Sequence, residues 1–197
     1  MDATEWDERY RSADRLWSMT PNLFVADRLA QMTPGRGLDL ASGEGRNAIW
    51  LAERGWAMTA IDFSDVASSR GAEQTDLVDF VVADVLEWEP DGRFDLVVVA
   101  YLHLMPPDLE KVVRTSREWL APGGELFLIG HDVSNIEDGY GGPQVPEILW
   151  NVPDLLTWLD GLTVIEAQVV RRPVDTEEGR VFARDALVRV RARSGSE

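Results

Sequence analysis

The sequence predicts an α/β protein with a mostly parallel seven-stranded sheet, helices on both faces and an antiparallel hairpin at its C-terminal end. Three observations support this fold class. Short apolar runs alternate with amphipathic helical patterns between residues 37 and 130, as expected for buried parallel strands joined by helices. The first apolar run leads into a glycine-rich turn, Gly43-Glu44-Gly45. Two late strand patterns are joined by a short polar segment, which is typical of a hairpin.

Local patterns place each element along the chain. The second helix begins at Pro21-Asn22, and Pro106-Pro107 marks the start of a later helix, because proline suits a helix's first turn. Residues 132–147 are rich in glycine, proline and polar residues and are predicted as a long loop. We expect helices at 4–15, 22–32, 45–54, 65–73, 107–120 and 153–160, and strands at 37–41, 57–62, 78–83, 94–100, 124–130, 162–172 and 181–192.

Length and composition predict one domain with a full core. The chain has 197 residues, of which 45% are hydrophobic. We expect an N-terminal helical cover over 1–35, a ligand-binding core over 36–131, a substrate loop and hairpin over 132–193, and a tail over 194–197. No window approaches the ~18 apolar residues of a membrane span, and the acidic N-terminus does not resemble a signal peptide. A cytoplasmic location is therefore expected.

Charge and cysteine content narrow the function classes. The formal net charge is −16 and the chain has no cysteine. Cysteine-based metal sites, thiolate catalysis and disulfides are excluded. Binding of nucleic acid requires clustered lysine and arginine, whereas the basic residues here are scattered among more numerous acids. We expect a small-molecule substrate, with neither nucleic acid nor membrane as a partner, and the oligomeric state stays open.

The segment from Leu38 to Trp50 is the most informative part of the chain. A strand, a glycine turn and a helix in succession place backbone N–H groups and a helix N-terminus around a polar ligand. Two cofactor classes fit this turn. The spacing from Gly43 to Ala48 matches a dinucleotide fingerprint, with Asp62 about 20 residues further on. An acid four residues before the first glycine, here Asp39, is instead typical of turns that bind S-adenosylmethionine (SAM).

The downstream segments favour SAM. The chain resembles a class I SAM-dependent methyltransferase, with its Rossmann-like fold, from Trp6 to about Gly130. Five segments in the family's order carry the resemblance: Leu38–Trp50, Ala60–Ser64, Val81–Val85, Phe94–Tyr101 and Leu120–Leu128. Within the class, the segments Trp6–Tyr10, Pro21-Asn22 and Gly130–Asp132 most resemble the tellurite-resistance and thiopurine type. By analogy, that likeness suggests a soft acceptor atom such as sulfur, selenium or tellurium.

The resemblance implies how the cofactor is held. Asp62 would take both ribose hydroxyls, and Asp84 would accept from the adenine amino group. Trp6 and Tyr10 would fold over the sulfonium cation, with packing of the first helix as the equal alternative. Arg46 would pair with the methionine carboxylate, or else lie exposed in its helix. The expected SAM-binding residues are Trp6, Tyr10, Asp39, Ala41, Gly43, Gly45, Arg46, Asn47, Asp62, Phe63, Asp84, Val85, Ala100 and Tyr101.

Candidates for acid–base chemistry are few. His131 follows the fifth strand at its carboxyl end, where ligands bind in open α/β sheets, and is the candidate general base. The alternative, a histidine satisfied by the backbone at a strand end, is favoured. His103 is either a pocket residue or a helix-entry residue. At Tyr101, the Asn/Asp-Pro-Pro-aromatic motif of enzymes that methylate amino groups of bases or glutamine is missing, which disfavours such substrates. No metal-ligand spacing is present.

The segment between Asp62 and Phe80 is shorter than is usual in the family, and its helix has little apolar stripe. We therefore expect thin cover over one face of the sheet beside the adenine. Two other functions stay open from the residues. The dinucleotide spacing would suit an NAD(P)-dependent oxidoreductase, and the short helix with no obvious base would suit a SAM-binding protein without transferase activity.

Overall fold

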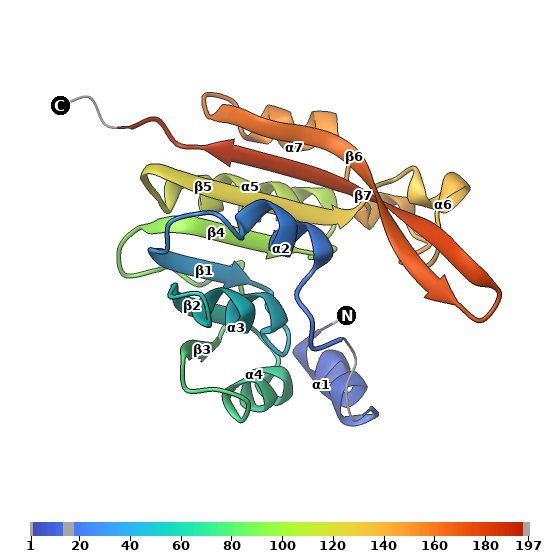
Figure 1. Cartoon of the computed structure of the whole chain (residues 1–197), viewed down its shortest axis with the longest axis horizontal. Helices are drawn as coiled ribbons and strands as arrows, with labels where there is room; N and C mark the ends of the chain where they lie inside the picture. The colour runs from blue at the N-terminus through green and yellow to red at the C-terminus, as the bar shows by residue number, and fades with distance from the viewer. Residues whose placement is uncertain (1, 14–17, 195–197) are drawn as a thin grey trace. The chain divides into compact units, whose positions relative to one another are not determined.

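The computed structural model describes residues 2–13 and 18–194. Seven strands form one mixed sheet in the order β3-β2-β1-β4-β5-β7-β6 (Figure 1). The chain divides into two compact units, Met1–Val98 and Val99–Glu197. The predicted α/β fold with its C-terminal antiparallel hairpin is confirmed, whereas the single domain stays a prediction. The end of the first predicted helix, at 14–15, and the tail residues 195–197 lie outside the described residues.

Among its described residues, the first unit contains three complete parallel strands and four helices. Strand β1 pairs with β2, and β2 pairs with β3. Strand β4 (Phe94–Ala100) begins in this unit and ends in the second. The remaining elements of the first unit are α1 (Ala3–Arg11), α2 (Leu23–Leu29), β1 (Arg36–Leu40), α3 (Arg46–Ala52), β2 (Ala57–Asp62), α4 (Asp65–Ala72) and β3 (Val78–Val82).

Side-chain caps fix where three of these helices begin. Asp2 and Glu5 form a reciprocal capping box at the start of α1. The Oδ1 atom of Asn22 accepts from the first N–H groups of α2, and the Oγ atom of Ser64 accepts from Ala67 at the start of α4. These side chains satisfy backbone donors that have no partner within the helix.

Small residues let α4 pack closely on β3. A Cβ at Gly71 would lie 2.3 Å from Cε1 of Phe80, and one at Gly45 would lie 2.5 Å from the same atom. The helix buries Ala67, Ser68 and Gly71 instead of large apolar side chains. The weak apolar stripe noted in the sequence therefore reflects a close contact through glycine and not a missing layer.

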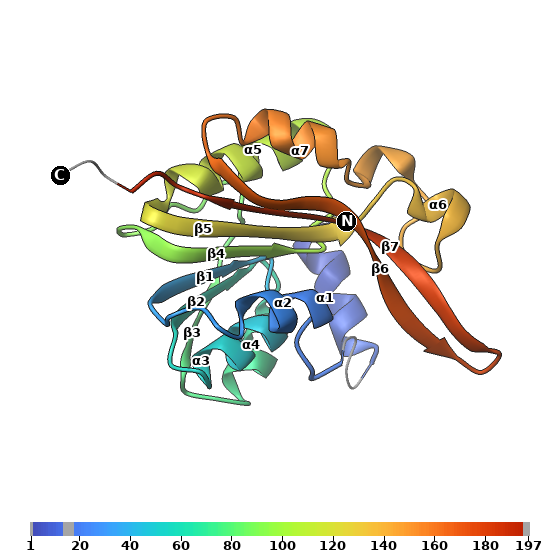
Figure 2. The same cartoon turned by 45° about the horizontal axis from the view of Figure 1, so that its top comes forward.

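The second unit contains a long hairpin paired with β5. Strand β5 pairs antiparallel with β7, which pairs antiparallel with β6. Helices α5 and α7 contact each other and lie on the same side of these strands (Figure 2). The elements are α5 (Pro106–Glu118), β5 (Leu120–His131), α6 (Asn135–Asp138), the 3-10 helix η1 (Pro146–Ile148), α7 (Val152–Trp158), β6 (Thr163–Thr176) and β7 (Gly179–Arg191).

The hairpin is longer than the sequence predicts. Pairing continues to Thr176 and Gly179, so that only two residues form the turn. The polar residues of this stretch suggested a linker, but they alternate with Val174 and Val181 in the register of paired strands. Pro173 is tolerated because β6 is the last strand of the sheet.

The segment predicted as a loop, 132–147, is held by specific hydrogen bonds. The Nδ2 group of Asn135 donates to the Gly141 carbonyl at 2.8 Å, and its Oδ1 atom accepts from the Arg184 N–H at 2.7 Å. Beyond the loop, the Trp150 N–H donates to the His131 carbonyl at 2.8 Å. The segment contains α6 and most of η1. Both helices are too short to produce a recognisable periodic pattern in the sequence.

The central strands form the core. Residues 96–99 of β4 and 126–129 of β5 are fully buried, as expected for strands covered on both faces. No helix within residues 2–13 and 18–194 is long and apolar enough to cross a membrane.

We predict that Leu128→Ala destabilises the protein by about 2–5 kcal/mol, because Leu128 is fully buried and its truncation leaves a cavity. Leu77→Ala is the matched control, since Leu77 is 60% exposed and should change stability by less than about 0.5 kcal/mol. Urea denaturation followed by circular dichroism measures both. Equal destabilisation by the two variants would contradict the burial assigned here.

Candidate functional site

The glycine turn after β1 adopts an uncommon backbone conformation. Ala41, Gly43 and Gly45 have φ values of +53°, +57° and +78°. A non-glycine residue such as Ala41 in the left-handed region is unusual and often marks a functional site. The turn is held by the Ser42 N–H, which donates to the Ile61 carbonyl at 2.9 Å. This conformation leads the chain directly into the N-terminus of α3.

Asp62 joins this turn to the end of β2. Its Oδ2 atom accepts from the Gly43 N–H at 2.8 Å, and its Oδ1 atom accepts from the Ser64 N–H at 2.9 Å. The residue is 6% exposed. Burial raises the pKa of Asp62 more than these two hydrogen bonds lower it. Each oxygen of this carboxylate keeps a second lone pair that can accept from a ligand.

Asp39 is a second buried acid, one strand away in β1. It is 1% exposed, and its Oδ2 atom accepts from the Ala48 N–H in α3 at 3.2 Å. Burial raises the pKa of Asp39 to about 7, against the opposing effects of the Ala48 N–H and Arg46. Asp39 therefore ties the strand to the helix that follows the turn.

Helix α1 is hydrogen-bonded to the segment that follows Asp62. The Ser64 hydroxyl donates to Oδ1 of Asp7 at 2.6 Å. The rings of Trp6 and Tyr10 lie 5.8 Å apart, and Tyr10 is buried. The Arg9 guanidinium lies 4.9 Å from the centre of the Trp6 ring. The Trp6 ring, which was expected to face the sulfonium cation of the cofactor, therefore already has a cationic neighbour in Arg9.

The remaining expected residues of this unit have mixed surroundings. Oδ1 of Asn47 accepts from the Asn22 N–H at 2.9 Å, which gives Asn47 a structural role at the start of α2. Nη1 of Arg46 lies 3.4 Å from the Ser18 hydroxyl. Asp84 is exposed, and its Oδ1 atom accepts from the Leu86 N–H at 2.9 Å. Phe63 and Val85 are half-buried.

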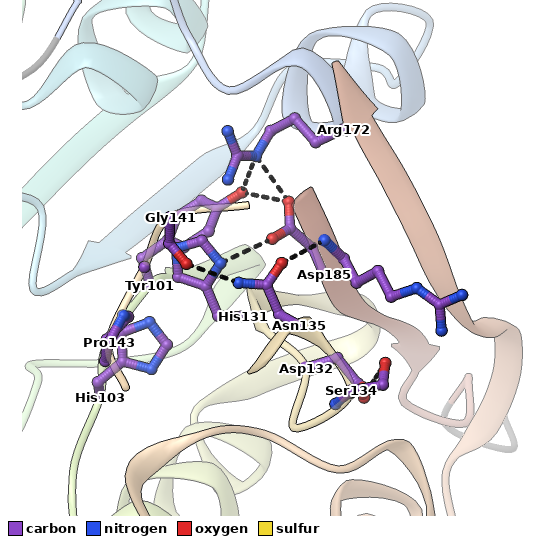
Figure 3. Close-up of polar contacts among 12 residues, drawn as sticks. Tyr101, His103, His131, Asp132, Ser134, Asn135, Gly141, Pro143, Arg172 and Asp185 are labelled. Carbon is purple, nitrogen blue, oxygen red and sulfur yellow. Dashed lines mark hydrogen bonds and ion pairs between the residues drawn. The ribbon is translucent and has the colours of Figure 1, made fainter. Parts of the chain in front are cut away.

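A separate polar cluster lies in the second unit, at the carboxyl ends of β4 and β5 (Figure 3). Oδ2 of Asp185 accepts from the Tyr101 hydroxyl and from Nε of Arg172, both at 2.7 Å. Nε of Arg172 also lies 2.9 Å from the Tyr101 oxygen. On its other side, Oδ1 of Asp185 lies 3.3 Å from Nδ1 of His131. We call these four residues, Tyr101, His131, Arg172 and Asp185, the Asp185 cluster.

Asp185 is the negatively charged member of this cluster. Burial opposes ionisation of the fully buried Asp185, but its contacts with His131, Arg172 and Tyr101 together hold its pKa below the ordinary range. Burial and the nearby Asp185 charge raise the pKa of Tyr101, so Tyr101 keeps its proton. Tyr101 also has a φ of +60°, and its N–H donates to the Ile129 carbonyl at 2.7 Å. The backbone there is held in an uncommon conformation.

His103 lies beside the Asp185 cluster. Its ring is stacked on that of His131, with centroids 5.5 Å apart and planes 17° apart. Nδ1 of His103 lies 3.1 Å from the Ile148 carbonyl, so this nitrogen carries the ring proton. Burial lowers the pKa of His103 to about 4, which keeps the ring neutral near pH 7.

Sequence reasoning missed Asp185 and Arg172. Both belong to the hairpin, far along the chain from His131, so no local spacing relates them. One signal was present. Asp185 is the only acid in the predicted strand 181–192, and Ala183 and Leu187, two residues before and after it, are apolar. A charge on the buried side of a strand requires partners, and this pattern identifies the position even without the pairing.

Comparison with known proteins relates the central part of the chain to methyltransferases. Residues 38–124 match a family model described as a methyltransferase domain. The chain is 36% identical over 132 residues to a demethylmenaquinone methyltransferase of Thermus thermophilus, covering 61% of this chain and 60% of the relative. It is 30% identical over 133 residues to a ubiquinone biosynthesis O-methyltransferase of Pseudomonas aeruginosa. This alignment covers 64% of this chain and 57% of the relative. The chain thus spans about three fifths of the length of these relatives.

Solved structures share the fold over nearly the whole chain. The N-methyltransferase NodS from Bradyrhizobium japonicum, in complex with S-adenosyl-L-homocysteine, aligns with a TM-score of 0.72 at 21% identity and covers 97% of this chain and 99% of its own. The chain has the Rossmann-like fold of the class I methyltransferases. TehB from Haemophilus influenzae aligns with a TM-score of 0.74 at 16% identity. The alignment covers 95% of this chain and 66% of TehB. A third structure comes from work on the conversion of a disulfide bond into a thioacetal group during echinomycin biosynthesis. It aligns with a TM-score of 0.76 at 22% identity and covers 99% of this chain and 93% of its own.

The matched methyltransferase domain and the S-adenosyl-L-homocysteine complex of NodS agree with the expected cofactor class, SAM. The residues of this chain fit that cofactor. Burial raises the pKa of the Asp62 carboxyl more than its two backbone N–H donors lower it. Two ribose hydroxyls would therefore supply the hydrogen bonds that this buried carboxylate can still accept. The NAD(P) alternative is not favoured. Among the described residues, no group of three or more histidine, aspartate or glutamate side chains is placed to hold a metal ion.

The individual site residues stay predictions of the resemblance. The structure brings Gly43 and Asp62 into direct contact. Ala100 and Tyr101 lie at the end of β4, and His131 ends β5. His131 is not a histidine satisfied only by backbone, because it faces Asp185.

We predict that Asp39→Asn stabilises this protein, without added SAM, at pH 8 but not at pH 3. Because folding raises the Asp39 pKa, the wild-type protein loses stability as pH rises from the unfolded value toward about 7. Asparagine removes that loss, a gain on the order of 3 kcal/mol at pH 8. Urea denaturation at both pH values measures it. Asp79→Asn, on the exposed face of β3, is the control. A variant no more stable than wild type at pH 8 would contradict the assignment.

Proposed function

We propose that this chain transfers a methyl group from SAM to a small-molecule acceptor. The observation that carries the proposal is the arrangement of Asp62 and the glycine turn. A buried carboxylate with spare acceptor capacity is hydrogen-bonded to Gly43, within the segment that matches the methyltransferase domain. SAM supplies, when bound, an electrophilic methyl group on a positively charged sulfur.

The residues of the first unit would bind and orient the cofactor. Asp62 is held by two backbone N–H groups, so its oxygens are fixed before a ligand arrives. Asp7 in α1 braces Ser64, two residues after Asp62. Orientation of this kind supplies much of the acceleration of a displacement, with roughly 7–11 kcal/mol available from positioning alone.

Two hypotheses for the acceptor atom have separate support. The first is a soft sulfur, selenium or tellurium atom, as in the tellurite-resistance and thiopurine type, and the fold likeness to TehB supports it. The second is a hydroxyl oxygen. One relative is named an O-methyltransferase of ubiquinone biosynthesis. The Asp185 cluster favours the second, because a soft anion needs no base whereas a hydroxyl does.

Partners and location rest on the sequence. We propose a small-molecule substrate without nucleic acid or membrane, since the net charge of −16 suits neither a phosphate backbone nor an anionic surface. A cytoplasmic location also stays a prediction from the sequence.

We predict that Asp62→Ala weakens SAM binding at least about 100-fold. Two hydrogen bonds to a charged acceptor are each worth roughly 1.5–3 kcal/mol, and every 1.4 kcal/mol is tenfold in affinity. Calorimetric titration with SAM and S-adenosylhomocysteine measures the change. Asp79→Ala is the matched control, because Asp79 is an exposed aspartate on the neighbouring strand.

The same titration includes NADP(H). Binding of NADP(H) alone by the wild type would overturn the proposed function, as would unchanged SAM affinity in Asp62→Ala. Circular dichroism of Asp62→Ala tests whether loss of binding comes from the missing carboxylate or from loss of the fold. Asp62→Asn provides a second variant, since it keeps one acceptor oxygen for a backbone N–H.

A further inference from the structure

Helix α1 supplies a cap for the start of another helix, α4. Oδ1 of Asp7 accepts from the Ser64 hydroxyl at 2.6 Å and from the Val66 N–H at 3.4 Å. Asp7 and Ser64 are 57 positions apart in the chain, and both belong to the first unit. The N-terminus of a helix attracts negative charge, so Asp7 stabilises the start of α4 in addition to the cap that Ser64 provides.

The Asp7 carboxylate is oriented from its own helix. Nη2 of Arg11, one turn along α1, donates to Oδ2 of Asp7 at 3.2 Å, while Oδ1 faces α4. The hydrogen bond from Ser64 is the largest effect on the pKa of Asp7 and lowers it, so Asp7 is ionised near pH 7. An ionised carboxylate only accepts hydrogen bonds. The Ser64 proton therefore points to Asp7, which leaves a Ser64 lone pair for the Ala67 N–H at 3.1 Å.

Ser64 connects Asp7 to Asp62 of the proposed cofactor site. The Ser64 side chain donates to Asp7, whereas its backbone N–H donates to Oδ1 of Asp62 at 2.9 Å. Ser64 is fully buried, so both hydrogen bonds are shielded from water. The other oxygen of Asp62 accepts from the Gly43 N–H. One of the N–H groups that orient the Asp62 carboxylate therefore belongs to a residue whose side chain is held by α1.

A second contact joins the end of α1 to the glycine turn. Nη1 of Arg70, in α4, donates to the Ala13 carbonyl at 3.1 Å. The same nitrogen lies 3.3 Å from Oε1 of Glu44, which stands between Gly43 and Gly45 and is 9% exposed. The segment of α1 is therefore attached to α4 at two places. One place leads to the exit from β2 and the other to the glycine turn, and these two backbone segments form the proposed cofactor site.

We propose that Asp7 is a positioning residue of the cofactor site, and that docking of α1 on α4 and binding of the cofactor at Asp62 strengthen each other. This inference rests on the proposed function. A docked α1 holds Ser64 where its N–H orients the Asp62 carboxylate, so less conformational freedom is lost when a ligand binds there. Because binding free energies are linked, the cofactor strengthens the docking of α1 by the same factor by which docking strengthens cofactor binding.

A double-mutant cycle on cofactor affinity tests the path through Ser64. The variants are Asp7→Ala, Ser64→Ala and the two combined, and calorimetric titration with S-adenosylhomocysteine measures their affinities. We expect Asp7→Ala to weaken binding about 10-fold in the otherwise wild-type protein. In the Ser64→Ala background the same substitution should change affinity by less than about twofold, because the partner hydroxyl is already absent. Independent losses that multiply in the combined variant would overturn the proposal.

Two further variants separate positioning from a general effect of substitution in α1. Asp7→Asn keeps an oxygen that accepts from Ser64, so it should bind S-adenosylhomocysteine at least about 3-fold more tightly than Asp7→Ala. Glu8→Ala is the matched control, because Glu8 is an exposed acid at the next position of the helix and should leave affinity unchanged. An Asp7→Asn variant as weak as Asp7→Ala would overturn the positioning role, as would equal losses in Glu8→Ala and Asp7→Ala.

Hydrogen exchange of the wild-type protein gives a test that does not depend on how the variants fold. Helix α1 has nine residues, and isolated helices shorter than about 12–15 residues are marginal in water, so its amides exchange when it undocks. We expect saturating S-adenosylhomocysteine to slow exchange in α1 about 10-fold, the same factor as the loss of affinity in Asp7→Ala. Exchange in α1 that S-adenosylhomocysteine leaves unchanged would overturn the coupling.

The wild-type titration separates this inference from the proposed function. If the wild type binds S-adenosylhomocysteine and Asp7→Ala binds it equally well, the proposed function stands and the positioning role of Asp7 is overturned. If the wild type binds NADP(H) but neither SAM nor S-adenosylhomocysteine, the proposed function is overturned and the inference with it.

Discussion

A buried carboxylate is stable only when donors surround it, and this constraint shapes both units of the chain. Asp39 and Asp62 lie in neighbouring parallel strands and are nearly inaccessible to water. Together they accept from three backbone N–H groups, those of Gly43, Ala48 and Ser64. The turn between β1 and α3 and the exit from β2 therefore depend on two acids that sit where apolar residues would otherwise be.

The buried acids of the two units differ in how far hydrogen-bond donors and positive charges offset the effect of burial on their pKa values. Burial outweighs the donors around Asp39 and Asp62, and their pKa values are raised. At Asp185 the donors outweigh burial, and the pKa is lowered. An acid that lacks donors has capacity for a ligand, whereas a fully compensated acid is suited to hold a neighbouring side chain. The first situation suits cofactor binding by Asp62, and the second suits the orientation of His131.

The parts that the sequence predicts well are those that local chemistry determines. The glycine turn at Gly43 and the acid at Asp62 lie within one strand–turn–helix–strand segment, so their relation follows from spacing. The relation of His131 to Asp185 arises from strand pairing, because β5 and β7 place them opposite each other in register. No spacing in one sequence reveals such a pair. The extended hairpin was missed for a related reason, since the residues near Asp175 are polar although they are paired.

Charge pairing explains how the Asp185 cluster is tolerated inside the protein. Arg172 and Asp185 form an ion pair at 2.7 Å, and Tyr101 keeps its proton because burial and the Asp185 charge raise its pKa. Burial also lowers the pKa of His103 to about 4, so this neighbouring ring is neutral near pH 7. A buried carboxylate is costly unless it is paired and hydrogen-bonded. The hairpin therefore brings Arg172 to Asp185 as the partner that its burial requires.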